Sequence, residues 1–280
     1  MPNPNVMIDL FALAQANAPE LEHAYADAQS LRPQADQSHV QAFVDWVDNS
    51  SRISINVRVY LVAEIVTGGK YQNIYDWADE QAAVSGQQRE TILRERLKQF
   101  FDKRISFDNA FENGDSFLYG ALNCGGLGLS AYGSCCMVLT QKFEKASTKV
   151  AYLNGDSLKV CVDAHGAVNE LQVRQNSAPS SHRAVLAAIK HSADLKSSVP
   201  ADWATLLFGG GSYMEAVFVG NVLVDSLECV RMSAVDYQRH WDMAFSSFGK
   251  SFNEAERALI HDFVQIMKAH NAAKPSLVVI

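Results

Sequence analysis

The spacing of apolar residues changes along the chain, from a helical period over the first fifty residues to an alternating period beyond them. Apolar-rich stretches near the beginning predict three helices, over residues 9–15, 19–31 and 38–49, with Ser38 as a candidate N-cap. We therefore expect a helical N-terminal piece over residues 1–50 and one larger domain over residues 51–280.

Period-two alternation begins at residue 51 and predicts a half-buried strand. The apolar and polar residues of this stretch alternate one by one: Ile53, Ile55 and Val57 against Ser54, Asn56 and Arg58. A helix is expected over residues 85–104, where Ser85 and Gln88 fit the S-x-x-Q capping box and apolar residues recur at helical spacing.

Beyond residue 110, short apolar runs divided by Gly, Asn and Asp predict an array of strands. The predicted strands cover residues 116–122, 131–141, 148–154, 156–163, 167–175, 212–219 and 226–232. A surface loop is expected at 176–182, and helices at 183–195, 200–208 and 253–270, the last capped by Asn253 and Glu256. Because strands and helices do not alternate regularly, the predicted fold class is α+β.

Composition and charge narrow the classes of partner. The chain has 280 residues, of which 48% are hydrophobic and 20% charged, so it can bury a sizeable core. Its formal net charge of −7 argues against nucleic acid, because phosphate binding relies on clustered Lys and Arg. No apolar stretch reaches the roughly 18 residues that cross a bilayer, and the N-terminus does not resemble a secretory signal. We expect neither a nucleic-acid nor a membrane partner, and a soluble protein that folds inside the cell that makes it.

The cysteines form an odd set without the C-x2-C pairs of a zinc site. They are Cys124, Cys135, Cys136, Cys161 and Cys229. Their apolar surroundings favour buried free thiols, and we expect no metal site. A hydrolase that uses Cys135 or Cys136 stays open as an alternative.

Three polar residues interrupt apolar, strand-like runs: Arg58, Ser134 and Glu215. Charged groups are rarely buried in strands unless they are paired or take part in chemistry. Alternation alone would let Arg58 face solvent, and Ser134 could bond a neighbouring backbone group. Glu215 differs, because the apolar residues around it in SYMEAVFVG predict burial on both faces of the strand.

An Arg, then a Ser on a strand, then a Glu at the start of a later strand is an order that resembles the mono-ADP-ribosyltransferase fold. The resemblance implies split antiparallel β-sheets, NAD as co-substrate without a metal, and Glu215 as the catalytic residue. It also implies that Arg58 holds NAD and that Ser134 supports the site. Tyr213 stands where that family usually has Gln or Glu.

A broader resemblance runs from about Arg52 to Arg231. Five blocks are similar in order and spacing to those of a poorly characterised bacterial family: GKYQNIYDWA, YGALN, YGSCCMVL, NGDSL and YMEAVFVGNVLVDSLECV. The acidic chain also resembles bacterial effectors that ADP-ribosylate threonine of host ubiquitin. This resemblance implies a toxin-like effector, made in the bacterial cytoplasm and acting in the host cytosol on a host protein, with ubiquitin as candidate. The chain has INVRVY where the family has H-F-H-P-D-R, which leaves open whether Arg58 or another residue anchors NAD.

The chemistry of that reaction suits these residue types. Breaking the bond between nicotinamide and ribose develops positive charge on the ribose, which a fixed carboxylate at Glu215 would stabilise. A guanidinium such as Arg58 binds phosphate through a planar fork. Tyr71 would stack on the nicotinamide or pack in the core, and Asn73 would bond the carboxamide.

The segment before Glu215 is rich in glycine, which allows positive φ and close approach of a partner. The resemblance implies that Gly210, Gly211 and Tyr213 contact the acceptor protein. An alternative hypothesis, motivated by the INVRVY departure, is a catalytically silent protein-binding module of the same fold.

Overall fold

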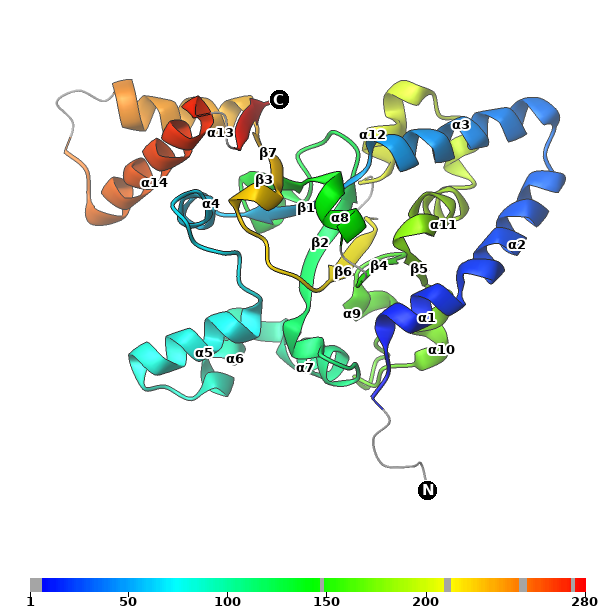
Figure 1. Cartoon of the computed structure of the whole chain (residues 1–280), viewed down its shortest axis with the longest axis horizontal. Coiled ribbons are helices and arrows are strands. Elements are labelled where there is room, and N and C mark those ends of the chain that lie inside the picture. The colour runs from blue at the N-terminus through cyan, green and yellow to red at the C-terminus, as the bar shows by residue number, and fades with distance from the viewer. Residues whose placement is uncertain (1–6, 147–148, 209–212, 247–250, 273–274) are drawn as a thin grey trace. The chain divides into compact units, whose positions relative to one another are not determined.

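The computed structural model describes residues 7–146, 149–208, 213–246, 251–272 and 275–280 (Figure 1). The fold is α+β, as predicted. The chain forms two compact units, each built from three segments. The first unit holds Met1–Ser51, Gln72–Leu122 and Ser147–Val219, and the second holds Arg52–Tyr71, Asn123–Ala146 and Gly220–Ile280.

Four antiparallel strands form the sheet of the first unit, in the order β5-β4-β6-β2. They are β2 (Leu118–Asn123), β4 (Val150–Leu153), β5 (Ser177–Pro179) and β6 (Glu215–Phe218). The first residue of β6, Glu215, lies opposite Ala121 of β2 and Leu153 of β4. The predicted carboxylate therefore begins a strand that is paired on both sides.

The three helices predicted over the first fifty residues are present as α1 (Leu10–Ala16), α2 (Ala18–Ser30) and α3 (Gln34–Ser50). A further helix of the first unit, α11 (Arg183–Lys190), packs against α2 and α3 (Figure 1). The N-cap prediction at Ser38 is wrong, because α3 begins at Gln34, with Pro33 in the N-cap position, more than one turn before Ser38. Inside the helix, the Ser38 hydroxyl donates to the carbonyl of Gln34 at 3.2 Å.

Residues 74–109 form three helices where one was expected over 85–104: α5 (Ile74–Ser85), α6 (Arg89–Leu97) and α7 (Phe101–Asn109). Gly86, with a φ of 71°, ends α5, so Ser85 belongs to the preceding helix and the predicted capping box is wrong. Lys98, with a φ of 51°, ends α6 and is the first residue of the 3-10 turn that leads into α7. The break lets α6 and α7 pack on each other around a small apolar core: Tyr75, Ala78, Ile92, Leu93 and Phe101.

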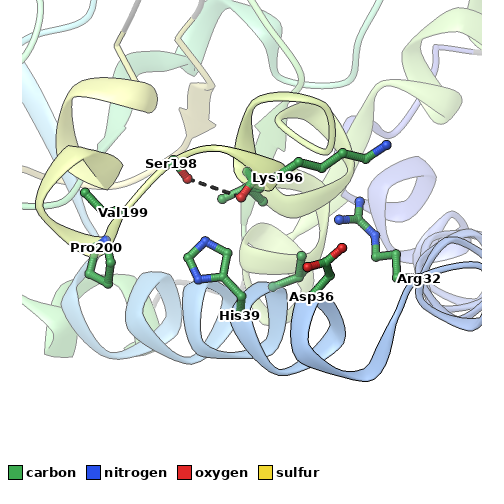
Figure 2. A pocket seen from close by; sticks show the side chains of 9 residues that line it. Arg32, Asp36, His39, Lys196, Ser198, Val199 and Pro200 are labelled. Carbon is green, nitrogen blue, oxygen red and sulfur yellow. Dashed lines mark hydrogen bonds between the residues drawn. The ribbon is translucent and has the colours of Figure 1, made fainter.

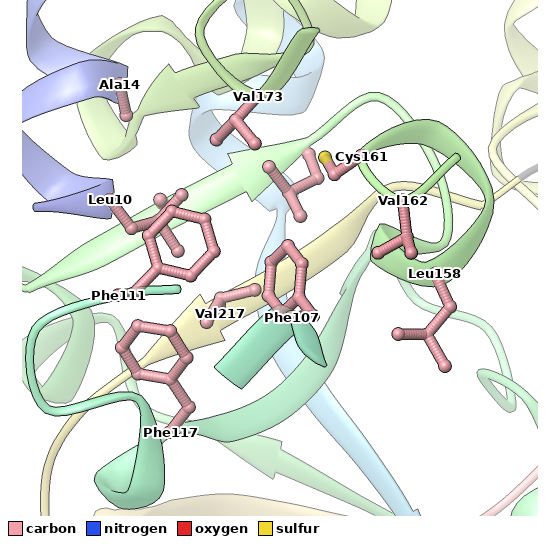
Figure 3. Packing of buried hydrophobic residues seen from close by; sticks show 12 residues of the cluster. Leu10, Ala14, Phe107, Phe111, Phe117, Leu158, Cys161, Val162, Val173 and Val217 are labelled. Carbon is pink, nitrogen blue, oxygen red and sulfur yellow. The ribbon is translucent and has the colours of Figure 1, made fainter. Parts of the chain in front are cut away.

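The larger core of the first unit joins α1 and α7 to the sheet (Figure 3). Its aromatic centre consists of Phe107, Phe111 and Phe117, which contact one another in sequence with ring centroids 4.8 and 6.0 Å apart. Val217 of β6 belongs to the same core, so the strand that begins at Glu215 is fixed by apolar packing.

Two predicted strands, 156–163 and 167–175, are wrong, because these stretches contain α9 (Ser157–Val160) and α10 (Glu170–Gln175). Asp156 and Asn169, which lie inside these predicted strands, are instead N-caps: their side chains accept hydrogen bonds from the first turns of the two helices. The predicted loop at 176–182 contains β5, and the helix expected at 200–208 is present as a 3-10 turn and α12 (Trp203–Leu206).

The second unit has a mixed sheet in the order β1-β3-β7-β8: β1 (Arg52–Val57), β3 (Cys135–Leu139), β7 (Leu227–Met232) and β8 (Ser276–Val279). β7 pairs in parallel with β8, a strand the sequence did not predict, and the other pairs are antiparallel.

The helices of the second unit are α4 (Val59–Val66), α8 (Gln141–Ala146), α13 (Ala234–Trp241) and α14 (Glu254–Asn271). α14 packs against α4 and β8, and its predicted cap is confirmed by reciprocal 2.9 Å hydrogen bonds between Asn253 and Glu256. Within the described residues, no helix is both long and apolar enough to cross a membrane.

Candidate functional site: a buried network around Glu215

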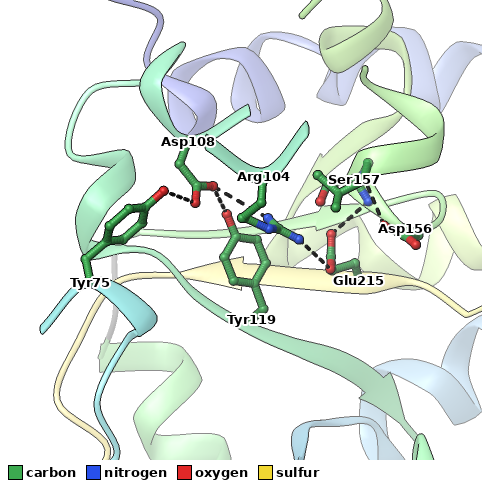
Figure 4. A network of polar contacts seen from close by, with 8 residues as sticks. Tyr75, Arg104, Asp108, Tyr119, Asp156, Ser157 and Glu215 are labelled. Atoms are coloured by element: carbon green, nitrogen blue, oxygen red, sulfur yellow. Dashed lines mark hydrogen bonds and ion pairs between the residues drawn. The ribbon is translucent and has the colours of Figure 1, made fainter. Parts of the chain in front are cut away.

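Glu215 is buried, as its sequence context predicted, with 5% of its surface exposed. Its Oε2 accepts a 2.8 Å hydrogen bond from the backbone N–H of Ser157, the first residue of α9. Its Oε1 lies 4.0 Å from Nη2 of Arg104, which comes from α7. A helix start and a guanidinium therefore hold the carboxylate from two different elements (Figure 4).

Arg104 lies between two carboxylates. Its Nη1 is 3.5 Å from Oδ1 of Asp108, one turn further along α7, while Nη2 faces Glu215. Its Cζ lies 3.8 Å from the ring centroid of Tyr119 on β2, which adds a cation–π contact. The side chain is only 11% exposed, so these contacts are made largely away from water.

Asp108 extends the network toward α5. It is 1% exposed and accepts hydrogen bonds from the hydroxyls of Tyr119 and Tyr75, the latter at 2.7 Å. A groove of about 520 Å³, lined by residues of α5, α6 and α7, opens at Tyr75. We call the connected set the Glu215 network: Tyr75, Arg104, Asp108, Tyr119, Ser157 and Glu215 (Figure 4).

Burial and neighbouring charges shift the pKa values of the groups in this network. Burial raises the pKa of Glu215, against the opposing effect of Arg104, and the same two effects act on the pKa of Asp108. Burial alone would lower the pKa of Arg104, but interactions with Tyr119, Asp108 and Glu215 raise it. Burial also raises the pKa of Tyr75 and Tyr119, so both phenols remain hydrogen-bond donors at neutral pH.

A desolvated carboxylate with these partners is suited to two tasks. It interacts strongly with a positive charge that appears beside it, because little water screens the interaction. It also takes up a proton more readily than an ordinary glutamate, since its pKa is raised. Shifted pKa values of this kind are common in catalytic sites, although structural ion pairs show them too.

Three of the predicted site residues belong to the second unit: Arg58, Ser134 and Tyr71. Arg58 is exposed and occupies the N-cap position of α4 without a capping hydrogen bond from its side chain, and β1 ends one residue before it. Ser134 is half-buried and directly precedes β3. Tyr71 is half-buried and forms an isolated bridge with Val222.

The other predicted site residues belong to the first unit, with Glu215. The side-chain oxygen of Asn73 accepts from the N–H groups of Tyr75 and Asp76, both at 2.8 Å, and so caps α5. Tyr213 is buried, and its carbonyl accepts a 3.1 Å hydrogen bond from Nζ of Lys190. Gly210 and Gly211 lie outside the described residues. That Arg58 and Ser134 meet Glu215 stays a prediction.

Sequence reasoning missed the partners of Glu215. Arg104 and Asp108 are four residues apart on a helix that also buries Phe101 and Phe107, and this spacing places two charges on one face. This pair of opposite charges, four residues apart and beside buried aromatic residues, was the feature of the sequence that could have indicated a buried ion pair. Its connection to Glu215, 111 residues later, depends on tertiary packing alone.

The cysteines are free and buried, as predicted. Burial raises the pKa of Cys135 to about 12, despite a hydrogen bond with Ser134, and the pKa of Cys136 to about 11. Thiols with such pKa values remain protonated at neutral pH, which argues against a cysteine nucleophile. Among the residues that the structure describes, no three His, Cys, Asp or Glu side chains are grouped as a metal ion would require.

No protein-family model matches the chain, and no curated protein matches it significantly.

Proposed function

We propose that the protein transfers ADP-ribose from NAD to a protein side chain, with Glu215 as the catalytic residue. The observation that carries this proposal is a buried carboxylate at the first residue of β6, fixed by the Ser157 N–H at 2.8 Å. Its raised pKa is consistent with a role in chemistry.

In this reaction the bond between the nicotinamide nitrogen and C1 of the ribose breaks, and neutral nicotinamide leaves. The ribose carries positive charge in the transition state, which the Glu215 carboxylate stabilises at short range. A hydroxyl oxygen of the acceptor forms the new bond to C1, and its proton passes to Glu215, whose raised pKa favours uptake.

The remaining parts of the proposal rest on residue type and on the family resemblance. Arg58, exposed at the start of α4, binds the phosphates of NAD, and Ser134 orients the ribose. Tyr71 and Asn73 contact the nicotinamide. Gly210, Gly211 and Tyr213 select the acceptor, for which threonine of host ubiquitin is the candidate, with the protein acting as a bacterial effector in the host cytosol.

One observation favours a second candidate, a catalytically silent binding module. Both oxygens of Glu215 already have neighbours in the first unit, Ser157 and Arg104, as a structural ion pair would. The two candidates differ in what they predict for a substitution that removes the charge of Glu215 and retains its shape. A catalytic Glu215 predicts a loss of transfer activity without a loss of stability, whereas a structural ion pair predicts a loss of stability.

The test incubates the full chain with biotin-labelled NAD and ubiquitin and measures both label transfer and nicotinamide release. Glu215→Gln is compared with wild type and with the matched control Glu228→Gln, whose side chain is 43% exposed on β7. We expect transfer by wild type and by the control, and its loss in Glu215→Gln. Label transfer that is unaffected in Glu215→Gln contradicts the role of Glu215. Absence of both transfer and nicotinamide release in wild type contradicts the transferase function and favours the binding module.

A further inference from the structure

A second cavity of the first unit lies between the N-terminal half of α3 and the segment that precedes α12 (Figure 2). Its volume is about 280 Å³, just below the 300–1,000 Å³ that is typical for drug-sized ligands. A molecule that fills it must therefore be small. Figure 2 shows Asp36 and His39 on α3 and Arg32 just before it, facing Lys196 and Ser198 on the other side.

The cavity wall carries buried polar atoms without hydrogen-bond partners among the described residues. They are Nη1 of Arg32 and Nε2 of His39. The other terminal nitrogen of Arg32, Nη2, donates to the carbonyl of Ser192 at 3.3 Å, which fixes the guanidinium at the wall. A buried polar atom without a hydrogen-bond partner costs about 1–3 kcal/mol, so these atoms point to a polar group that enters the cavity.

His39 is held in place by an aromatic cluster behind it. Its ring centroid lies 5.5 Å from that of Trp203, which in turn contacts Phe43 and Trp46 at 5.3 and 5.5 Å. The wall is therefore preorganised, which lowers the entropic cost of binding a ligand.

The charges of the wall define the chemistry of that ligand. Arg32 and Lys196 supply two cations, and Asp36 supplies one carboxylate. The cations suit a carboxylate, and Asp36 suits an ammonium group but would repel a phosphate dianion. Besides the polar residues His39 and Ser198, the wall has four apolar residues, which suit a hydrocarbon side chain: Val40, Leu195, Val199 and Pro200.

We infer that this cavity binds a small zwitterion of the amino-acid type with an apolar side chain. The carboxylate pairs with Arg32 and Lys196, the ammonium pairs with Asp36, and the side chain lies on the apolar wall. The inference is independent of the Glu215 network, because the cavity residues belong to different elements from those of the network.

Isothermal titration calorimetry of the full chain tests this inference with leucine as the probe. Two probes of similar shape serve as matched controls: 4-methylpentanoate, which lacks the amine, and 3-methylbutylamine, which lacks the carboxylate. Inorganic phosphate is the fourth probe. We expect leucine to bind at least about tenfold more tightly than the other three, a difference of about 1.4 kcal/mol.

Three variants of cavity residues, Arg32→Gln, Asp36→Asn and Lys196→Gln, test whether leucine binds in this cavity, and Asp27→Asn is the control. Arg32→Gln and Asp36→Asn are each expected to weaken leucine binding by about tenfold or more, whereas Asp27→Asn, an exposed change on α2, leaves it unchanged. Lys196→Gln changes an exposed residue and so tests the site even where Arg32→Gln fails to fold.

Four results would overturn the inference. The first is no leucine binding at about 10 mM, where a Kd of 1 mM would give nearly full occupancy. The second is binding of 4-methylpentanoate or 3-methylbutylamine as tight as that of leucine, and the third is tighter binding of phosphate than of leucine. The fourth is leucine binding that all three site variants leave unchanged.

Discussion

Replacing Glu215 with Gln removes one charge from a buried network and leaves its shape nearly intact. The amide oxygen of Gln can still accept the hydrogen bond from the Ser157 N–H, which is 2.8 Å long in the structure. Arg104 keeps its second carboxylate, Asp108, at 3.5 Å. The substitution therefore tests the charge of Glu215 without leaving a buried cation unpaired.

The change in the free energy of unfolding that Glu215→Gln causes depends on two opposing contributions. At 4.0 Å, the attraction between Glu215 and Arg104 is about 4 kcal/mol with an effective dielectric constant of about 20. The cost of removing the ionised carboxylate from water is larger, because the net effect on the pKa of Glu215 is a rise. We therefore expect Glu215→Gln to leave the free energy of unfolding within about 1 kcal/mol of wild type or to increase it. Arg104→Met, which leaves two buried carboxylates unpaired, should lower it by about 3–5 kcal/mol.

Urea unfolding at pH 7 measures these differences, and the transfer assay measures activity on the same samples. A catalytic Glu215 predicts an activity loss on the order of 100-fold or more without a loss of stability. The reasoning is refuted if Glu215→Gln lowers the free energy of unfolding by about 3 kcal/mol or more and leaves transfer unchanged, because the carboxylate would then be a structural ion pair.

Two further predictions concern the end of α11. Burial lowers the pKa of His191 to about 4 from 6.5, so the folded state binds its proton less tightly than the unfolded state, and stability falls as pH drops below 6.5. Between pH 7 and pH 5 this proton uptake lowers the free energy of unfolding of the wild type by about 2 kcal/mol, and His191→Leu should abolish this decrease. Urea unfolding at both pH values measures it, and an equal decrease in wild type and variant would contradict the prediction. Lys190 donates from Nζ to the carbonyls of Asn154 at 2.5 Å and of Tyr213 at 3.1 Å. Lys190→Met should lower the free energy of unfolding in urea by about 1–3 kcal/mol, and no change would show that the carbonyls find other partners.

Local signals in the sequence predicted the elements whose patterns are complete. The alternation around Ile55 gave β1, and the Asn253–Glu256 spacing gave the start of α14. The burial of Glu215 was predictable because apolar residues surround it on both faces of its strand. In each case the information lies within about ten residues, the range over which periodicity and capping act.

The wrong strand predictions arose where a stretch has too few apolar residues to show its period. The predicted strands 156–163 and 167–175 include Asp156 and Asn169, which are N-caps in the structure, and the apolar residues after them are too few to distinguish a helical period from an alternating one. The contacts around Glu215 could not be predicted from neighbouring residues in the sequence, for a different reason. Arg104 lies on a helix far away in sequence, and only packing of the shared core brings it to β6.

The distribution of charge in the Glu215 network argues for chemistry over structure alone. One guanidinium, that of Arg104, faces two carboxylates, and it lies closer to Asp108 than to Glu215, at 3.5 Å against 4.0 Å. Two tyrosine hydroxyls also donate to Asp108, which stabilises the ionised form of that residue further. Glu215 accepts one hydrogen bond, from the Ser157 N–H, against the two that Asp108 accepts, and is thus the less well compensated of the two carboxylates. A structural ion pair would gain from matching one cation to one anion, whereas unmatched negative charge in a dry site is what a positively charged ribose would neutralise in the transition state.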